Sequence, residues 1–299
     1  MDLIKRTKKF IEKRWNGQSP LLLGYSGGPD SKALLYLLLD AGVRPHLAHI
    51  DHGWRGESGR EAEELWEEAQ KLGLPFHLKR LGELPKANLE DFCRKQRLKF
   101  YRELFEKFPF QALLLGHQRD DRAETTLKRI LEGASLPFLA GLSEEGVLDG
   151  MEVWRPLLEV KKTHLQSYLS EKGLKPLSDP TNGDTKYLRA RMRKEILPEL
   201  ARSFGKEIDK NLALLSVRSA ELKEYLDRKV DRIPLQNGVE GNYYIQENWE
   251  ALEARHLLKR LGLVSAEQVD RAAAALVRGE ENIWVGSLRI DRKKVFIKT

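Results

Sequence analysis

The chain has 299 residues, with 52 Lys and Arg against 45 Asp and Glu, which gives a net charge of +7. Its single cysteine, Cys93, excludes an intramolecular disulfide and any thiolate-ligated zinc or iron–sulfur centre built from this chain alone. No apolar run reaches the about 20 residues that a membrane helix needs, and the first residues lack the apolar core of a signal peptide. We therefore expect a folded cytoplasmic protein without a membrane segment.

The positive charge lies mainly in the first two thirds of the chain. Residues 207–299 carry 16 basic and 15 acidic side chains, whereas residues 1–206 carry 36 and 30. A basic protein attracts polyanions such as nucleic acids. A basic pI is common, however, so charge alone leaves nucleic-acid binding as one interpretation among several.

Apolar runs of strand length alternate with amphipathic segments of helix length in the first half. The predicted strands are 21–25, 46–51, 76–79 and 112–116, and the predicted helices are about 30–41, 57–72, 88–107 and 120–132. Because parallel strands need a long crossover, this alternation predicts an α/β fold with a doubly wound parallel sheet covered by helices on both faces. Such sheets bind ligands at the carboxyl ends of their strands.

The pattern becomes helical after residue 156. The predicted helices are 160–172, 186–201 and 207–230, interrupted by a loop that contains Pro176, Pro180 and Gly183. The last segment predicts a helix pair at 249–262 and 265–278, followed by a β ribbon from 283–285 and 288–298. We expect one domain over residues 1–215, which includes a helical extension, and a smaller α+β domain over residues 216–299.

The most informative motif follows the first predicted strand directly. Two glycines let backbone N–H groups approach an anion, and the N-terminus of the following helix adds partial positive charge. The motif lacks the Lys-Ser/Thr ending of a Walker A loop. The alternative is an ordinary strand-to-helix turn in which Asp30 or Ser31 caps the helix. We expect phosphate binding by the whole motif, Ser26, Gly27, Gly28, Pro29, Asp30 and Ser31.

Four further segments carry residues suited to chemistry. Residues 49–55 (HIDHGWR) follow the second predicted strand, and residues 116–125 (GHQRDDRAET) follow the fourth. Residues 88–101 (NLEDFCRKQRLKFY) and 180–193 (PTNGDTKYLRARMR) are rich in basic side chains. The first two segments belong at the ligand-binding edge of the sheet. The two basic segments are either nucleic-acid contacts or solvated helix faces.

The loop resembles that of the PP-loop ATP pyrophosphatases, which split ATP between the α- and β-phosphates to adenylate a substrate. All five motifs, in this order, resemble those of the tRNA(Ile)-lysidine synthetases over about residues 20–200. The C-terminal part is similar to that family's second domain. The chain departs from the family pattern at Gln118, Arg122 and Ala190, where the family has His, Gln and Asn, and at its short loop over residues 131–142.

The resemblance implies a ligase that makes lysidine at the wobble cytidine of isoleucine tRNA with a CAU anticodon. ATP and Mg²⁺ are the implied cofactors, and free L-lysine and this tRNA are the implied partners. The cytosine O2 is adenylated, and the lysine ε-amine then displaces AMP at C2. The resemblance also implies that the C-terminal domain helps to hold tRNA and that the enzyme forms a homodimer, although no apolar stripe marks an interface.

The resemblance assigns roles to individual residues as follows. Asp30 is expected to hold the metal and to act in catalysis beside the pyrophosphate. The other expected catalytic residues are His117, as a proton acceptor or phosphate donor, with Asp120 and Asp121. Further expected contacts are His52 and Arg55 with ATP, Glu124 with the lysine ammonium, and Arg94, Arg97, Arg189 and Arg193 with RNA. The alternative for the acidic group is a helix start enriched in carboxylates by the helix dipole.

Two rival interpretations belong to other functional classes. The first is another PP-loop ATP pyrophosphatase that adenylates a small molecule or a different tRNA. The basic first 206 residues disfavour it, as does Asp2 where an N-terminal glutaminase would need a cysteine, and one cysteine disfavours a thiolating enzyme. The second rival, a non-catalytic RNA-binding protein with the same fold, is disfavoured by the intact loop.

Overall fold

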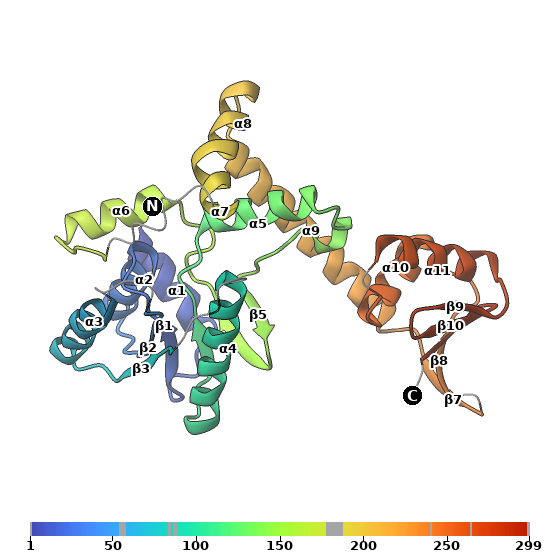
Figure 1. Ribbon diagram of the computed structural model, residues 1–299, viewed down its shortest axis with the longest axis horizontal. Coiled ribbons are helices and arrows are strands. Elements are labelled where there is room, and N and C mark those ends of the chain that lie inside the picture. Colours follow the sequence, from blue (N-terminus) through green and yellow to red (C-terminus); the bar gives the residue numbers. More distant parts are fainter. Residues whose placement is uncertain are drawn as a thin grey trace. The chain divides into compact units, whose positions relative to one another are not determined.

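The computed structural model describes residues 2–53, 58–82, 85, 89–177, 188–239, 241–263 and 265–297 (Figure 1). Arg55 and the first part of the second basic segment, up to residue 187, lie outside these ranges. The chain divides into two compact units, residues 1–132 with 141–216, and residues 133–140 with 217–299. Within the described residues, no helix has the length and apolarity needed to cross a membrane.

The first unit is built on a six-stranded sheet in the order β3-β2-β1-β4-β6-β5. Its strands are β1 (Leu21–Gly24), β2 (His46–Asp51), β3 (Phe76–Arg80), β4 (Ala112–Leu114), β5 (Glu145–Leu148) and β6 (Met151–Trp154). The strands from β3 to β6 pair in parallel, which confirms the predicted parallel sheet. The edge strand β5 is antiparallel to β6 and was not predicted. Asp149 and Gly150 form the tight turn between them, and both have positive φ.

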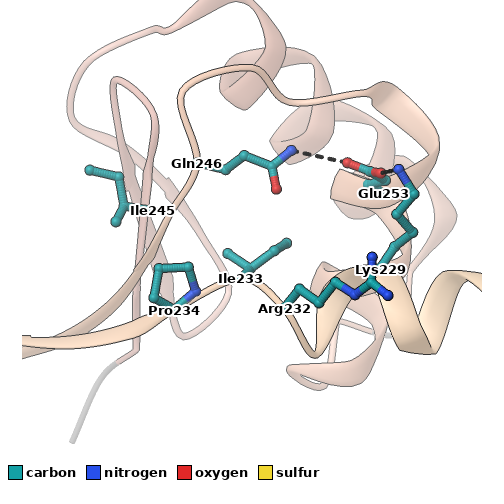
Figure 2. Close-up of a pocket in the computed structure, with 7 residues that line it drawn as sticks. All are labelled: Lys229, Arg232, Ile233, Pro234, Ile245, Gln246 and Glu253. Atoms are coloured by element: carbon teal, nitrogen blue, oxygen red, sulfur yellow. Dashed lines mark hydrogen bonds and ion pairs between the residues drawn. The ribbon is translucent and has the colours of Figure 1, made fainter.

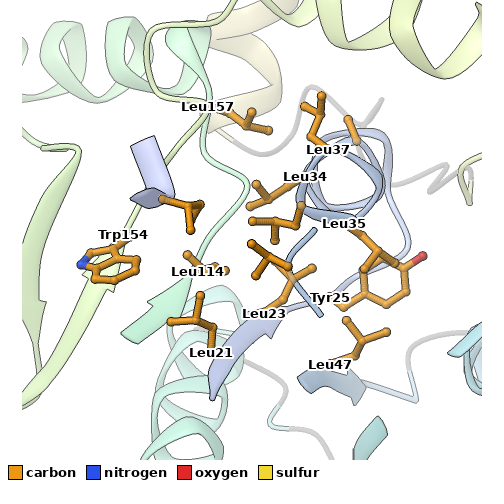
Figure 3. Close-up of a cluster of buried hydrophobic side chains, with 14 of the residues drawn as sticks. Leu21, Leu23, Tyr25, Leu34, Leu35, Leu37, Leu47, Leu114, Trp154 and Leu157 are labelled. Atoms are coloured by element: carbon orange, nitrogen blue, oxygen red, sulfur yellow. The ribbon is translucent and has the colours of Figure 1, made fainter. Parts of the chain in front are cut away.

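Successive sheet residues point to opposite faces, and both faces are buried. One face packs Leu21, Leu23, Leu114 and Trp154 against helix residues such as Leu34 (Figure 3). The other face belongs to a second core, in which strand residues such as Leu22 and Leu113 join Phe100, Tyr101 and Leu104 of a single long helix. The sheet is therefore doubly wound, as its continuous apolar strands predicted.

The first unit contains the helices α1 (Leu3–Glu12), α2 (Pro29–Asp40), α3 (Ser58–Leu72), α4 (Leu89–Lys107), α5 (Arg119–Leu131) and α6 (Lys162–Glu171). Helices α2 to α6 match predicted helices, whereas α1 was not predicted. The predicted helix at 186–201 exists from residue 188 onward as α7 (Leu188–Arg191), a π-helical turn (Met192–Ile196) and α8 (Leu197–Phe204). Pro198 has no N–H to donate to the carbonyl four residues before it, which accounts for the irregular helix at this point.

The second unit contains the end of α9 (Ile208–Val230), a short 3₁₀ turn (Leu136–Phe138), α10 (Ala251–Arg260) and α11 (Ala266–Arg278). Its five-stranded antiparallel sheet has the order β7-β8-β11-β10-β9. The strands are β7 (Leu235–Gly238), β8 (Gly241–Ile245), β9 (Ile283–Val285), β10 (Leu288–Asp291) and β11 (Lys294–Ile297). The helix pair is confirmed. The β ribbon predicted over 283–285 and 288–298 is present, but its second part is two strands rather than one, because the chain turns at Arg292, which has a positive φ, between β10 and β11.

Candidate active site

The loop between β1 and α2 is held in one shape by its own serines and by a neighbouring segment. Ser31 Oγ donates to the Gly28 carbonyl at 3.1 Å and lies 3.0 Å from Ser26 Oγ. Gly27 has a φ of 77°, and a Cβ there would come within 2.6 Å of the Leu177 side chain. Gly28 caps α2, so the free N–H groups of the first helical turn face the loop. This arrangement is suited to binding phosphate.

The loop after β4 touches the loop after β1. A Cβ on Gly116 would lie 3.0 Å from Asp30 C and 3.0 Å from Ser31 N. Strands β1 and β4 are neighbours, and the chain leaves β1 toward β2 on one side but leaves β4 toward β6 on the other. This is the topological switch point, where doubly wound sheets bind their ligands. The two predicted motifs therefore form one site, and Gly116 is needed for their close approach.

A capping box organises the start of α5. The Gln118 side chain accepts from Asp120 N at 2.7 Å, and the Asp121 carboxylate accepts from Gln118 N at 3.0 Å through Oδ2. Gln118 is fully buried. The departure from the family pattern at Gln118 is thus compatible with a well-capped helix, because its amide oxygen serves as the cap.

Arg193, in the π-helical turn, lies among the acidic residues of α5. Its Nε donates to Glu124 Oε1 at 2.6 Å, and its Nη2 donates to Glu124 Oε2 at 3.1 Å and to Asp121 Oδ1 at 3.2 Å. The Glu124 side chain is 1% exposed, and burial raises its pKa against the opposing effect of Arg193. Arg193 was expected at the RNA; in this structure its guanidinium pairs with the Glu124 and Asp121 carboxylates. Both oxygens of Asp121 and of Glu124 consequently have partners.

Asp30 and Asp120 are site carboxylates that form no ion pair with any described residue, so each could still bind a cation. Asp30 Oδ1 is buried and makes no hydrogen bond to any described residue. Burial raises the pKa of Asp30 to about 6, while Lys162 at the start of α6 opposes the rise. Burial also raises the pKa of Asp120, helped by Asp209 and Asp121. In the described part of the chain, no three His, Cys, Asp or Glu side chains are grouped as a ready metal site.

His117 is held as a neutral donor. The Arg155 guanidinium donates from Nε to His117 Nδ1 at 3.3 Å and from Nη1 to the Ser143 carbonyl at 2.9 Å. Burial lowers the pKa of His117 to about 4, opposed by Asp121 and helped by the cations Arg155, Arg189 and Arg97. Since Nδ1 accepts, the ring proton lies on Nε2. His117 can therefore donate a hydrogen bond to an anionic oxygen at neutral pH.

The remaining residues expected in the site differ in whether the structure places them near His117. Arg97 and Arg189 are close enough to His117 for their charges to lower its pKa, although both side chains are exposed. Arg94 is exposed, and its acidic partner, Asp91, is on its own helix at 3.7 Å. His52 is half-buried just after β2. The structure thus brings Arg97, Arg189 and Arg193 toward the site but gives no such evidence for Arg94.

Two site residues, Arg155 and Lys162, were missed in the sequence, and Gly116 was predicted only as the first residue of the 116–125 segment. Arg155 directly follows β6, so the rule that parallel strands carry ligands at their carboxyl ends identifies it once β6 is known. Gly116 lies two residues after the end of β4. Lys162 carries no sequence signal, because its relevance depends on where α6 begins relative to Asp30.

The fold and the site define a class of protein. Residues 1–200 match the PP-loop domain family. A U34-tRNA thiolase from Methanococcus maripaludis, solved with its 4Fe–4S cluster, has a similar fold, with a TM-score of 0.54 and 19% identity over 80% of this chain and 83% of the thiolase. At that identity the likeness concerns the fold alone.

Sequence relatives are more specific. The chain is 37% identical to a tRNA(Ile)-lysidine synthase of Protochlamydia amoebophila over 99% of its own length and 68% of the relative's. It is 43% identical to the tRNA(Ile)-lysidine synthase of Chlamydia pneumoniae over 70% of its length and 66% of the relative's. The matches thus span about two thirds of these relatives. The chain belongs to the tRNA(Ile)-lysidine synthase family of PP-loop proteins.

Proposed function

We propose that this protein forms lysidine at the wobble cytidine of isoleucine tRNA with a CAU anticodon, using ATP and free L-lysine in the cytoplasm. The observation that carries the proposal is the contact of Gly116 with Asp30 and Ser31, which joins the phosphate loop and the His117–Glu124 segment in one site. Both relatives are named tRNA(Ile)-lysidine synthase, which supports isoleucine tRNA as the substrate rather than a small molecule or a different tRNA.

In the first half-reaction the cytosine O2 attacks the α-phosphate, the bond to the β-phosphate breaks, and pyrophosphate leaves. The backbone N–H groups at the start of α2 are suited to hold the pyrophosphate as its charge develops. Lys162 and the Nε2 proton of His117 are suited to the α-phosphate oxygens. Lys162 is close enough to Asp30 to lower the pKa of that carboxyl, and His117 is close enough to Asp121 to have its own pKa affected.

Asp30 is the residue best suited to hold Mg²⁺. Its buried Oδ1 has no hydrogen-bond partner among the described residues. Asp120 is the second carboxylate that could bind the ion. Mg²⁺ commonly uses one or two carboxylates together with substrate phosphates and water, so a complete protein cage is not required. When bound, the ion would neutralise phosphate charge.

In the second half-reaction the lysine ε-amine attacks C2, and AMP departs. Only the neutral amine is a nucleophile, so the ammonium must first lose a proton. Asp120 is suited to accept it, because burial raises its pKa and the structure gives its carboxylate no ion pair among described residues. Glu124 and Asp121 are also suited to bind the ammonium. For this, Arg193 would have to give up some of its hydrogen bonds to these two carboxylates.

The basic residues around His117 are suited to the RNA backbone. Arg97 and Arg189 are exposed and close enough to affect the pKa of His117. We assign the tRNA phosphates near the reacting cytidine to these two residues. We further propose that residues 216–299 help to hold the tRNA and that the enzyme acts as a homodimer.

The test is a transfer assay with purified protein, ATP, Mg²⁺, labelled lysine and an unmodified isoleucine tRNA transcript with a CAU anticodon. We expect label in the RNA and one AMP released per lysine transferred. A matched transcript with uridine at the wobble position should accept no label, because uracil does not present the hydrogen-bond donors and acceptors of the cytosine edge.

Two outcomes would contradict the proposal. RNA-independent release of AMP with a small acceptor would leave the PP-loop chemistry intact but remove the tRNA substrate. RNA binding without release of pyrophosphate would favour a non-catalytic RNA-binding protein.

A further inference from the structure

The buried arginine at position 122 of α5 has its partner on another segment of the chain. The family pattern has Gln at this position, and Arg122 is 4% exposed. A guanidinium stays charged at all ordinary pH values, so its burial requires an anion or several acceptors. Arg122 Nη1 donates to Glu159 Oε1, and the two side chains form an ion pair. The departure from the family pattern therefore comes with a carboxylate that neutralises the new charge.

Glu159 belongs to the loop that joins β6 to α6. This loop and the first residue of α6 carry two cations of the site. Arg155 donates to His117, and the charge of Lys162 opposes the burial that raises the pKa of Asp30. Glu159 lies between these two cations in the chain. A bond that holds Glu159 in place therefore acts on the segment that presents both of them.

The loop is tightly packed and hydrogen-bonded to itself. Leu158 N donates to the Arg155 carbonyl at 3.2 Å, and Val160 N donates to the Leu157 carbonyl at 2.8 Å. The side chains of Leu157, Leu158 and Val160 are all completely buried. Because well-packed segments move as a unit, a shift at Glu159 would be passed on to Arg155.

A backbone hydrogen bond makes a second link between α5 and this loop. Arg119 N donates to the Val160 carbonyl at 2.9 Å, which satisfies one of the free N–H groups in the first turn of the helix. Positions 119 and 122 are three residues apart and so lie on one face of α5. Two links on one face fix both the position of the helix along the loop and its rotation. They therefore set the positions of the carboxylates that α5 carries, Asp120, Asp121 and Glu124.

We propose that Arg122 and Glu159 are positioning residues, whose ion pair sets the separation between the carboxylates of α5 and the cations Arg155 and Lys162. The inference rests on the proposed function, because that reaction needs both groups at fixed places around one phosphate. A displacement of about 1 Å at a reacting site can cost about 100-fold in rate. Loss of the pair should therefore slow the chemical step rather than weaken ATP binding, which depends on the loop between β1 and α2.

The test measures kcat for lysine transfer and KM for ATP with the full chain at saturating tRNA and lysine. Glu159→Ala removes the link and should lower kcat about tenfold, with KM for ATP within about twofold. Glu159→Gln keeps an oxygen that accepts from Arg122 and should restore most of the rate. Glu207→Ala is the matched control, because Glu207 is exposed and pairs with Lys161 of the same loop at 3.0 Å. Its kcat should equal that of the wild type.

A comparable ion pair in the second unit shows how much stability such a link contributes. Lys229 Nζ lies 3.4 Å from Glu253 Oε1, and the side chains are 40% and 8% exposed, against 37% for Glu159 and 5% for Arg122. Figure 2 shows this pair beside a cavity of about 400 Å³. Lys229→Ala and Glu159→Ala each remove the more exposed partner and leave a buried charge, so thermal melts should show similar losses of Tm. A loss of kcat well below the melting temperature then reports positioning rather than stability.

Hydrogen exchange of the protein alone supplies a readout that needs no substrate. The Arg119 amide, which donates to Val160, should exchange about tenfold faster in Glu159→Ala than in Glu207→Ala. The inference is overturned if the kcat of Glu159→Ala equals that of Glu207→Ala, or if only its KM for ATP changes. If the wild-type chain transfers no lysine, the proposed function fails. Exchange at Arg119 then decides the inference separately: faster exchange in Glu159→Ala supports it, and equal exchange in the two variants overturns it.

Discussion

Arg193 and Glu124 form a two-pronged ion pair between segments 69 residues apart, with Nε–Oε1 at 2.6 Å and Nη2–Oε2 at 3.1 Å. The pair fastens the π-helical turn to α5 and places a guanidinium where the lysine ammonium is expected. A carboxylate this deeply buried needs a cation or a proton, because an unpaired charge in the interior is strongly unfavourable. The pair therefore contributes to the stability of the site, because it supplies the cation that the buried Glu124 carboxylate needs.

Arg193→Met should lower the free energy of unfolding by about 3 kcal/mol, because it leaves Glu124 buried without its partner. The additional change Glu124→Gln should recover much of that loss, since the uncompensated charge is gone. Urea denaturation of the two single variants and the double variant measures the coupling. Glu199→Gln removes an exposed ion pair with Arg202 and should cost less than about 1 kcal/mol. Additive effects of Arg193→Met and Glu124→Gln would contradict the assignment.

The stability of the protein should depend on pH through Asp30. Its pKa rises from the ordinary 3.8 to about 6 on folding, so the folded chain holds more protons than the unfolded chain between these values. The free energy of unfolding should therefore fall as pH rises through this window and stay level above it. Asp30→Asn should remove this fall and be more stable at neutral pH by about 3 kcal/mol, while losing activity.

Denaturation curves of the two proteins from about pH 4 to pH 7 measure this dependence. Asp91→Asn is a suitable control, since Asp91 is exposed and its pKa is lowered mainly by its hydrogen bond to Lys95. Parallel pH profiles for the wild type and Asp30→Asn would show that the Asp30 carboxylate is not the group responsible.

Gly116→Ala should separate the two loops of the site. The added Cβ would meet backbone atoms of Asp30 and Ser31 at 3.0 Å, and backbone cannot move aside as a side chain can. We expect kcat/KM for ATP to fall by about 100-fold, because small displacements of a phosphate site are costly. The control is Gly59→Ala on α3, where nothing lies within 4 Å of the new Cβ. Unchanged kinetics for Gly116→Ala would mean that the contact between the loops has no catalytic consequence.

Lys32 connects the phosphate loop to the segment before residue 178. Its Nζ donates to the Lys175 carbonyl at 3.0 Å and pairs with Glu68 at 3.0 Å, and Glu68 also accepts from Tyr25 Oη at 2.6 Å. Next to this network, Leu177 N donates to the Gly27 carbonyl at 2.9 Å. The segment is thus fixed to the loop at two points.

Lys32→Met should therefore raise the KM for ATP by roughly tenfold with a smaller change in kcat, because it loosens the loop without removing a reacting group. Pyrophosphate exchange at varied ATP concentrations measures both constants. Lys71→Met serves as the control, since Lys71 is exposed and its ion-pair partner, Glu67, lies on the same helix. A loss of kcat at unchanged KM would place Lys32 in the chemical step instead.

Local patterns account for the elements that could be predicted from the sequence. Buried parallel strands are continuous apolar runs, and amphipathic helices repeat about every 3.6 residues, so β1 to β4 and the helices α2 to α6 were identified. The short hairpin β5–β6 was missed because its alternation covers only four residues per strand, although Asp149-Gly150 is a typical hairpin turn. The strand β11 was merged with β10 for a similar reason: Arg292 is not a usual turn residue.

The sequence by itself determined which residue types are available: a glycine-containing loop, carboxylates at a helix start and a histidine after a buried strand. The tertiary structure alone decided which of them meet. Arg193, which was predicted only as an RNA contact, is the partner of Glu124, and Arg155 donates to His117 and so fixes its ring. Hydrogen bonds and ion pairs act over a few ångströms, and chain folding brings distant residues within that range in ways that local periodicity does not encode.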